Sequence, residues 1–394
     1  MARMCSSVMM IRRNWRWYIT VALLCIIIWY SLPLTSVMTC RNPESTTTEP
    51  HIIYGNEQNE VQILKKENVE PSPTKINERY LVYVCDDKNK CGGWGDRQRG
   101  IVCSFFLSMV WKRTFKIVLT SPCDIRPYYQ PTKEYNWIFT EEELKGLQYK
   151  TNKTLNYMAN CTLLNLNLNE SETAEVLYVK ANCYSYEKIV KNYTKFLPDF
   201  LKNIHYKNRA LIFREAWNRL MIPTERLTSQ VSKIESSGKI NLDAKTSGNE
   251  LICAHLRIRH CGYFPRPFKG LPLSAVSKIW DFIDDNYHEK SRIFVATDDL
   301  DVRKSAISKY GARYIGSYAM VIHPDNMRFN LTLACSSQEA AYVDQLMLSK
   351  CNVLIYCRRS GFSIHASYLK IKGGEIYTIQ GHTNTSVSLK KRTT

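Results

Sequence analysis

Short apolar runs alternate with polar segments along most of the chain, and five of these runs predict β-strands. Tyr80–Val84, Phe115–Leu119 and Val353–Cys357 are almost wholly apolar, which is typical of strands buried on both faces of a parallel sheet. Leu251–His260 and Arg292–Thr297 are strand-like runs that also carry charged residues. Helical periodicity lies between or after these runs, at 273–286, 339–349 and 364–369, so the order predicts an α/β protein.

The first predicted strand opens a βαβ unit. A glycine-rich turn at Cys91–Gly100 and an apolar helix at Ile101–Trp111 separate Tyr80–Val84 from Phe115–Leu119. Glycines in such a turn allow a ligand to approach the backbone, and the start of a helix offers N–H groups to an anion. The glycine spacing matches neither the dinucleotide-binding fingerprint nor a Walker loop.

An apolar stretch near the N-terminus predicts a membrane anchor. No charged residue lies between Arg16 and Arg41, and basic residues precede the stretch. We expect a cytosolic tail at 1–16, a transmembrane signal anchor at 17–38 and a polar stem at 39–78, with the remainder lumenal. A cleaved signal peptide is the alternative, but the apolar stretch exceeds the usual ~7–15-residue signal core.

Glycosylation sequons and cysteines also indicate a secretory location. Six N-x-S/T sequons predict glycans at Asn152, Asn160, Asn169, Asn192, Asn330 and Asn384. Of 14 cysteines, Cys5 and Cys25 precede the lumenal part, and the other 12 would tend to pair in an oxidising compartment. The spacing of Cys85, Cys91 and Cys103 fits no familiar zinc pattern, so no metal is expected.

The formal charge of +18 suits a polyanion, an anionic membrane or a phosphorylated small molecule. A lumenal location excludes nucleic acid as a partner, and the anchor itself accounts for membrane attachment. We expect an N-terminal α/β domain at 79–228, a polar linker at 229–249 and a C-terminal nucleotide-binding domain at 250–394.

Charged and small residues at the ends of the later strands are candidates for ligand binding. Arg257 follows an apolar strand, and its guanidinium suits a pyrophosphate. Asp298 ends the next strand and could accept from a base or ribose. The turn Ser360–Ser363 could donate hydrogen bonds to phosphates. In open α/β sheets such strand ends lie at the ligand-binding edge.

These motifs, in this order, resemble those of the GDP-fucose-dependent fucosyltransferase superfamily, which includes xyloglucan, nodulation, core α1,6 and protein O-fucosyltransferases. The matching residues are Gly93-x-Gly95-Asp96-Arg97-x-Arg99-Gly100, His255-x-Arg257, Ala296-Thr297-Asp298 and Ser360-Gly361-Phe362-Ser363. They are spread over about residues 80–370.

The resemblance implies a GT-B-like fold, with two Rossmann-like domains facing a cleft. It also implies an inverting, metal-independent Golgi enzyme that moves L-fucose from GDP-fucose to a glycan or glycoprotein. Arg257 and Asp96 would be catalytic. The donor would contact the remaining residues of the set, which are Gly93, Gly95, Arg97, His255, Asp298, Ser360, Gly361, Phe362 and Ser363.

One position departs from the family pattern. His-x-Arg-x-x-Asp is common in the family, but His260 occupies the last slot here. Two alternatives therefore stay open: another nucleotide-sugar transferase of the same fold, or a non-catalytic lumenal relative that binds carbohydrate or nucleotide. Candidates for the general base, besides Asp96, are Asp124, Glu215 and Asp299.

Overall fold

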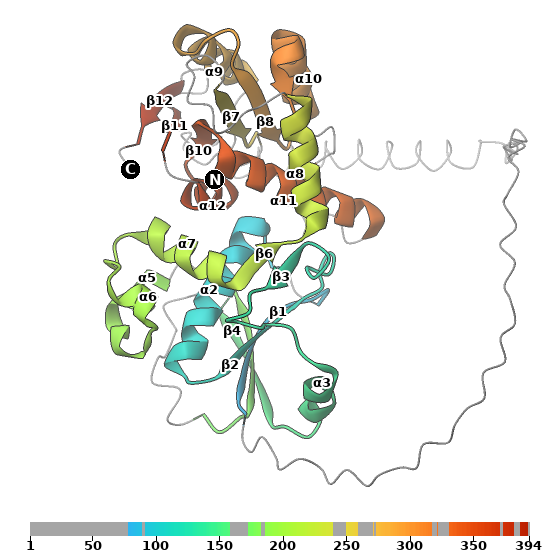
Figure 1. Cartoon of the computed structure of the whole chain (residues 1–394), viewed down its shortest axis with the longest axis vertical. Coiled ribbons are helices and arrows are strands. Elements are labelled where there is room, and N and C mark those ends of the chain that lie inside the picture. The colour runs from blue at the N-terminus through green and yellow to red at the C-terminus, as the bar shows by residue number, and fades with distance from the viewer. Residues whose placement is uncertain are drawn as a thin grey trace, which may run out of the picture. The chain divides into compact units, whose positions relative to one another are not determined.

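The computed structural model shows that the C-terminal four-fifths of the chain fold as one compact unit containing two large sheets (Figure 1). The described residues are 78–88, 91–157, 172–182, 186–238, 250–258, 271, 273–316, 321, 331–370, 373–381 and 387–392. The predicted tail, the anchor and all of the stem except residue 78 lie outside this set. Within the described residues, no helix has the length and apolar character needed to cross a membrane.

The first large sheet has four parallel strands in the order β2-β1-β5-β4. Its strands are β1 (Tyr80–Cys85), β2 (Thr114–Leu119), β4 (Asn152–Tyr157) and β5 (Val176–Ala181). Every residue of β1 is buried, as its apolar sequence predicts. The helix α2 (Trp94–Val110) packs on β1 and β5. The βαβ unit expected from the sequence is therefore confirmed.

The glycine-rich segment before this helix differs from the prediction. It was expected to be a turn through Gly100, but α2 already begins at Trp94, so Gly95 and Gly100 are helical. Their role is close packing: a Cβ on Gly100 would lie 1.9 Å from the carbonyl oxygen of Ala181, on β5. Only Gly92, just before the helix, has a left-handed backbone among the glycines of this segment, with φ of +78°.

The second large sheet has six strands in the order β12-β11-β10-β7-β8-β9. All neighbouring pairs are parallel except β11 and β12. Its strands are β7 (Leu251–Leu256), β8 (Arg292–Thr297), β9 (Tyr314–Ile315), β10 (Val353–Cys357), β11 (Glu375–Gly381) and β12 (Val387–Lys391). Two helices lie between strands of this sheet in the sequence: α9 (Leu273–Asn286) follows β7, and α10 (Leu300–Tyr310) follows β8. The bounds of α9 are those predicted.

Four helices connect the two sheets. They are α7 (Arg209–Leu220), α8 (Glu225–Ser237), α11 (Leu331–Lys350) and α12 (Gly361–Leu369). Contacts join α12 to α2 and α7, and α11 to α8 and α12. The largest apolar cluster extends from the first large sheet to the second, because it includes Leu81 of β1, Tyr342 of α11 and Leu354 of β10.

The segment predicted as a linker begins inside a helix. Residues 229–237 belong to α8, and 239–249 lie outside the described residues. Two ion pairs attach α8 to α11: Arg226 contacts Glu339 at 2.5 Å, and Lys350 contacts Glu235 at 2.7 Å. The domain boundaries stay a prediction.

The remaining described elements, except η3, lie between β2 and α8 in the sequence. A two-stranded antiparallel sheet pairs β3 (Tyr129–Pro131) with β6 (Met221–Pro223). The others are α3 (Glu141–Leu147), α5 (Tyr186–Asn192), η2 (Thr194–Phe196), α6 (Asp199–Lys202) and, in the second half, η3 (Gly311–Arg313).

Disulfides stabilise the arrangement, as the cysteine content predicts. Cys85–Cys91 closes the loop between β1 and α2, and Cys253–Cys351 joins β7 to the residue after α11. Cys123–Cys335 connects the loop after β2 to α11, across 212 residues of sequence. Covalent closure of so long a loop restricts the unfolded chain, and it links the segment after β2 to α11.

Gly95→Ala should destabilise the protein. A Cβ at Gly95 would lie 2.4 Å from the carbonyl carbon of Gly361 and 2.5 Å from the backbone nitrogen of Phe362, so α2 and α12 would have to separate. We expect a loss of about 1–3 kcal/mol in the free energy of unfolding, measured by urea denaturation. Gly146→Ala is the matched control, because a Cβ at this helical glycine meets no atom within 4 Å. Equal effects of the two substitutions would contradict this interpretation.

Candidate active site

A cavity, called here the central cavity, lies where the carboxyl ends of several parallel strands meet the starts of α2 and α12. Its wall includes the segment that follows β1, residues at the ends of β7 and β8, the turn after β10, and one side of α11. The start of a helix presents N–H groups and a partial positive charge. The cavity therefore suits an anionic ligand.

The structure brings the sequence-predicted residues together. The lining includes Arg257, Asp96, Gly93, Gly95, Arg97, His255, Asp298, Ser360, Gly361 and Phe362. Ser363 lies beneath the cavity instead, fully buried in the first turn of α12. Four motifs that are separated by up to 270 residues thus meet at one place, while their individual roles stay predictions.

Arg257 is positioned by a carboxylate from the neighbouring strand. Its Nε lies 3.3 Å from Oδ2 of Asp298, and the other oxygen of Asp298 accepts a 2.8 Å hydrogen bond from the backbone N–H of Ile258. The Asp298 side chain is 8% exposed and that of Arg257 is 20% exposed. The ion pair uses Nε, and within the described residues no other contact engages the two Nη groups of Arg257, so they can bind a ligand.

His255 is a neutral, fixed part of the wall. Burial, reinforced by the nearby charge of Arg257, lowers the pKa of His255 to about 3. Its Nδ1 is hydrogen-bonded to the hydroxyl of Ser363, and its ring lies 5.0 Å from that of Phe362. Ser363 therefore orients His255.

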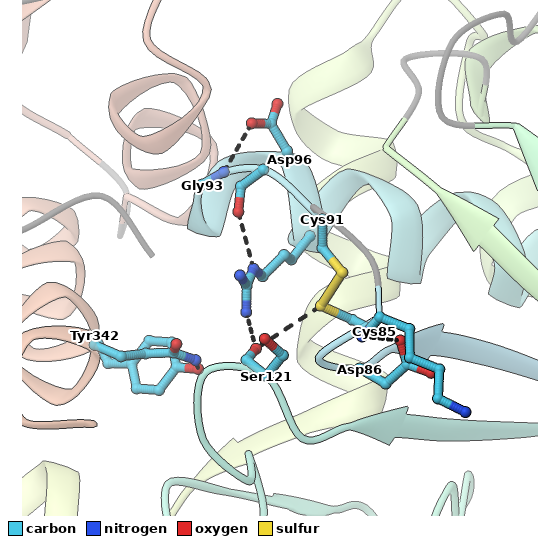
Figure 2. Close-up of a disulfide and its surroundings, with 11 residues drawn as sticks. Cys85, Asp86, Cys91, Gly93, Asp96, Ser121 and Tyr342 are labelled. Carbon is cyan, nitrogen blue, oxygen red and sulfur yellow. Dashed lines mark hydrogen bonds between the residues drawn. A yellow bond between two sulfur atoms is a disulfide. The ribbon is translucent and has the colours of Figure 1, made fainter. Parts of the chain in front are cut away.

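The start of α2 is organised around Asp96. Its Oδ2 accepts a 3.0 Å hydrogen bond from the Gly93 N–H, as Figure 2 shows, and Oδ1 pairs with Arg99. Arg97 is almost fully buried and donates to the carbonyl oxygens of Gly92 and Ser121. The Cys85–Cys91 disulfide lies beside these contacts (Figure 2). Arg97 thus connects the loops after β1 and β2, while Asp96 remains about one-third exposed.

One side of α11 also lines the central cavity, which the sequence did not predict. Gln338, Ala341 and Asp344 recur at three-residue spacing and line the central cavity. Burial raises the pKa of Asp344 to about 7, although the charge of Arg303 acts in the opposite direction. The sequence did contain a signal for this position, because Asp344 is the one aspartate of a largely apolar helix. Arg359, in the turn before α12, is a second missed lining residue.

The other proposed bases lie in different settings. Asp124 pairs with Arg126 at 2.5 Å, and Asp299 caps α10 by accepting from the N–H groups of Asp301 and Val302. Neither of these, nor Glu215 on α7, lines the central cavity. Within the described residues, no group of three metal-ligating side chains gathers.

Two of the six predicted glycosylation sites fall in the described part of the chain. Asn152 in β4 and Asn192 at the end of α5 are both exposed. Asn160, Asn169, Asn330 and Asn384 lie outside the described residues.

No protein-family model matches this sequence, and neither does any curated protein. Solved structures do match. A variant of Arabidopsis thaliana FUT1 in complex with GDP aligns with a TM-score of 0.52 at 12% identity, covering 79% of this chain and 74% of that one. The chain shares the fold of FUT1. This likeness confirms the predicted α/β, GT-B-like fold.

Two further structures align less closely. Fucosyltransferase NodZ from Bradyrhizobium has a TM-score of 0.48 at 11% identity, covering 81% of this chain and 100% of that one. POFUT1 in complex with GDP has a TM-score of 0.46 at 11% identity, covering 77% of this chain and 98% of that one.

Asp344→Asn should make stability less sensitive to high pH. The folded protein holds the Asp344 proton more tightly than the unfolded chain, so this group stabilises at low pH and loses that contribution between about pH 4 and pH 7. Asparagine does not ionise, so it makes no pH-dependent contribution of this kind. We expect the variant to gain about 2–3 kcal/mol relative to the unaltered protein on going from pH 5 to pH 8, measured by urea unfolding. Asp301→Asn, at an exposed position, is the control; a pH-independent difference for Asp344→Asn would refute the prediction.

Proposed function

We propose that this protein transfers L-fucose from GDP-fucose to a glycan or glycoprotein acceptor, by an inverting reaction that needs no metal. The observation that carries the proposal is the meeting of four motifs in the central cavity, at the starts of α2 and α12. Support also comes from the shared fold of FUT1, which is described in complex with GDP. The donor diphosphate would bind at the start of α12, with Arg257 beside it.

Departure of GDP places negative charge on the diphosphate. Arg257 offers its Nη groups, and Asp298 fixes the guanidinium in place. Groups that are already oriented stabilise this charge without reorganising during the reaction. The start of α12, at Ser360 and Gly361, supplies a further positive end.

Asp96 is the favoured base for the acceptor hydroxyl. It lines the central cavity and is about one-third exposed, whereas Asp124 and Glu215 lie elsewhere. Inversion places the acceptor on the face of fucose opposite GDP, so with the diphosphate at the start of α12 we assign the base to α2.

The non-catalytic alternative rested on His260, where the family pattern has a carboxylate. His260 lies outside the described residues, but Asp298 already provides Arg257 with a carboxylate partner. The departure therefore does not leave Arg257 without a counter-charge. This observation favours the catalytic proposal, with transfer from another nucleotide sugar as the second candidate.

GDP binding should depend on the guanidinium of Arg257. We expect isothermal titration of the purified full-length protein in EDTA to show binding of GDP and GDP-fucose, and weaker binding of UDP-galactose. Arg257→Ala should weaken GDP binding at least about tenfold, because a charge-assisted hydrogen bond contributes about 1.5–3 kcal/mol. Arg257→Lys keeps the charge but loses the fork, so its effect should be intermediate.

Arg126→Ala removes an exposed arginine outside the cavity and is the matched control. Equal GDP affinity in all variants would exclude the central cavity as the donor site. GDP binding without measurable hydrolysis or transfer of GDP-fucose would favour the non-catalytic alternative.

We further propose that the protein is a single-pass type II protein of the Golgi membrane with a lumenal catalytic part. The predicted anchor at 17–38 supports this, and so do the three disulfides within the described residues, which form in oxidising compartments.

Glycosylation tests this orientation. The exposed side chains of Asn152 and Asn192 should both carry glycans when the protein is expressed in animal cells. Treatment with an N-glycosidase should increase electrophoretic mobility, and Asn192→Gln should reduce that shift by one glycan. A cytosolic domain would show no shift at all.

A further inference from the structure

A second cavity, called here the basic cavity, lies at the far end of α12. It is formed by the start of α7, the last turn of α12, the loop before β11 and Arg392. It shares no lining residue with the central cavity. The nine residues of α12 span about 13 Å between the two. The basic cavity is therefore a separate site.

Its lining is cationic. Lys207, Arg209, Arg214, Lys370 and Arg392 contribute to it, and no aspartate or glutamate does. Arg209 is paired with Glu187 at 2.6 Å. In the part of the chain that the structure describes, no carboxylate forms an ion pair with any of the other four cations. Uncompensated positive charge in a concave surface attracts and holds anions.

Lys370 is built into this site. The residue is 7% exposed, and its Nζ donates to the carbonyl oxygens of Cys351 and, at 2.6 Å, of Gly373. The next residue, Gly374, has φ of +86°, and a Cβ there would lie 2.7 Å from this Nζ. An ammonium has three donors, so one remains for a ligand. Burial lowers the pKa of Lys370, and an anion alongside would counter that cost.

The two lining arginines that form no ion pair, Arg214 and Arg392, each make one side-chain hydrogen bond within the described residues. Nη1 of Arg392 donates to the hydroxyl of Tyr356 at 2.7 Å, and Nη1 of Arg214 lies 3.5 Å from the carbonyl oxygen of Lys370. Each guanidinium therefore keeps most of its five donors. The start of α7, a 12-residue helix, adds its partial positive charge to the same cavity.

We propose that the basic cavity binds a phosphate or sulfate group of a small ligand. Several converging cations, two guanidinium forks and a helix start match the charge and the many acceptor oxygens of a tetrahedral oxyanion. Such a group could belong to a phosphate compound or to a sulfated sugar. The site lies one helix length from the central cavity, so an occupant would also contact the helix that forms the wall of that cavity.

Titration calorimetry of the full-length protein with inorganic pyrophosphate and, separately, with galactose 6-sulfate tests this proposal and distinguishes the two sources. We expect at least one probe to bind at physiological ionic strength. Arg214→Gln should weaken that binding about tenfold, by loss of charge-assisted hydrogen bonds. Lys207→Gln, at an exposed position where folding is not at risk, should weaken it severalfold.

Lys188→Gln removes the same charge from an exposed lysine outside the basic cavity and should leave the affinity unchanged. Pyrophosphate also suits the central cavity, so Arg257→Lys should affect only a binding event there and leave the event that Arg214→Gln weakens unchanged. A loss confined to Arg257→Lys would assign the anion to the central cavity and overturn the proposal. So would equal losses in Lys188→Gln and Lys207→Gln, or no binding of either probe.

Discussion

Two buried glutamines, Gln98 in α2 and Gln345 in α11, exchange hydrogen bonds of 2.8 and 2.9 Å between their side-chain amides. Gln345 also accepts from the indole N–H of Trp94 at 2.8 Å and donates to the carbonyl of Phe362 at 3.0 Å. A buried amide that loses its partners costs about 1–3 kcal/mol, so these groups fix the relative positions of three helices. The central cavity depends on that constraint, because it lies between the starts of two of them.

The close approach of α2 to α12 follows from the same constraint. At Gly95 the two helices touch backbone to backbone, and no side chain could be inserted there. The Cys123–Cys335 disulfide holds α11 against the loop after β2. The packing of Trp94 on Tyr342, with ring centroids 4.4 Å apart, holds it against α2. The cations and helix starts of the central cavity are consequently held in place by the fold, which is what the proposed electrostatic stabilisation of a leaving group requires.

The sequence predicted strands and ligand-binding strand ends well, because buried parallel strands are nearly continuous apolar runs. It predicted the glycine-rich segment poorly. Gly95 and Gly100 suggest a turn when local preference alone is considered, but both lie inside α2, where residues 361 and 181 leave no room for a side chain. Asp344 was missed for a related reason: helical periodicity shows that α11 is buried, but not which buried position faces a cavity. Such facts depend on contacts between distant segments.

The pairing of Arg257 with Asp298 shows what strand order adds to a motif. The two residues follow β7 and β8, where Leu256 lies opposite Thr297 in the parallel ladder. Residues one position further along both strands must then be neighbours, so a carboxylate reaches Arg257 from an adjacent strand. In the pattern of the superfamily that these motifs resemble, a carboxylate stands three residues after the arginine in sequence, where this chain has His260. An arginine at the end of a parallel strand can therefore keep its counter-charge when the local motif changes, provided that the neighbouring strand ends in an acid.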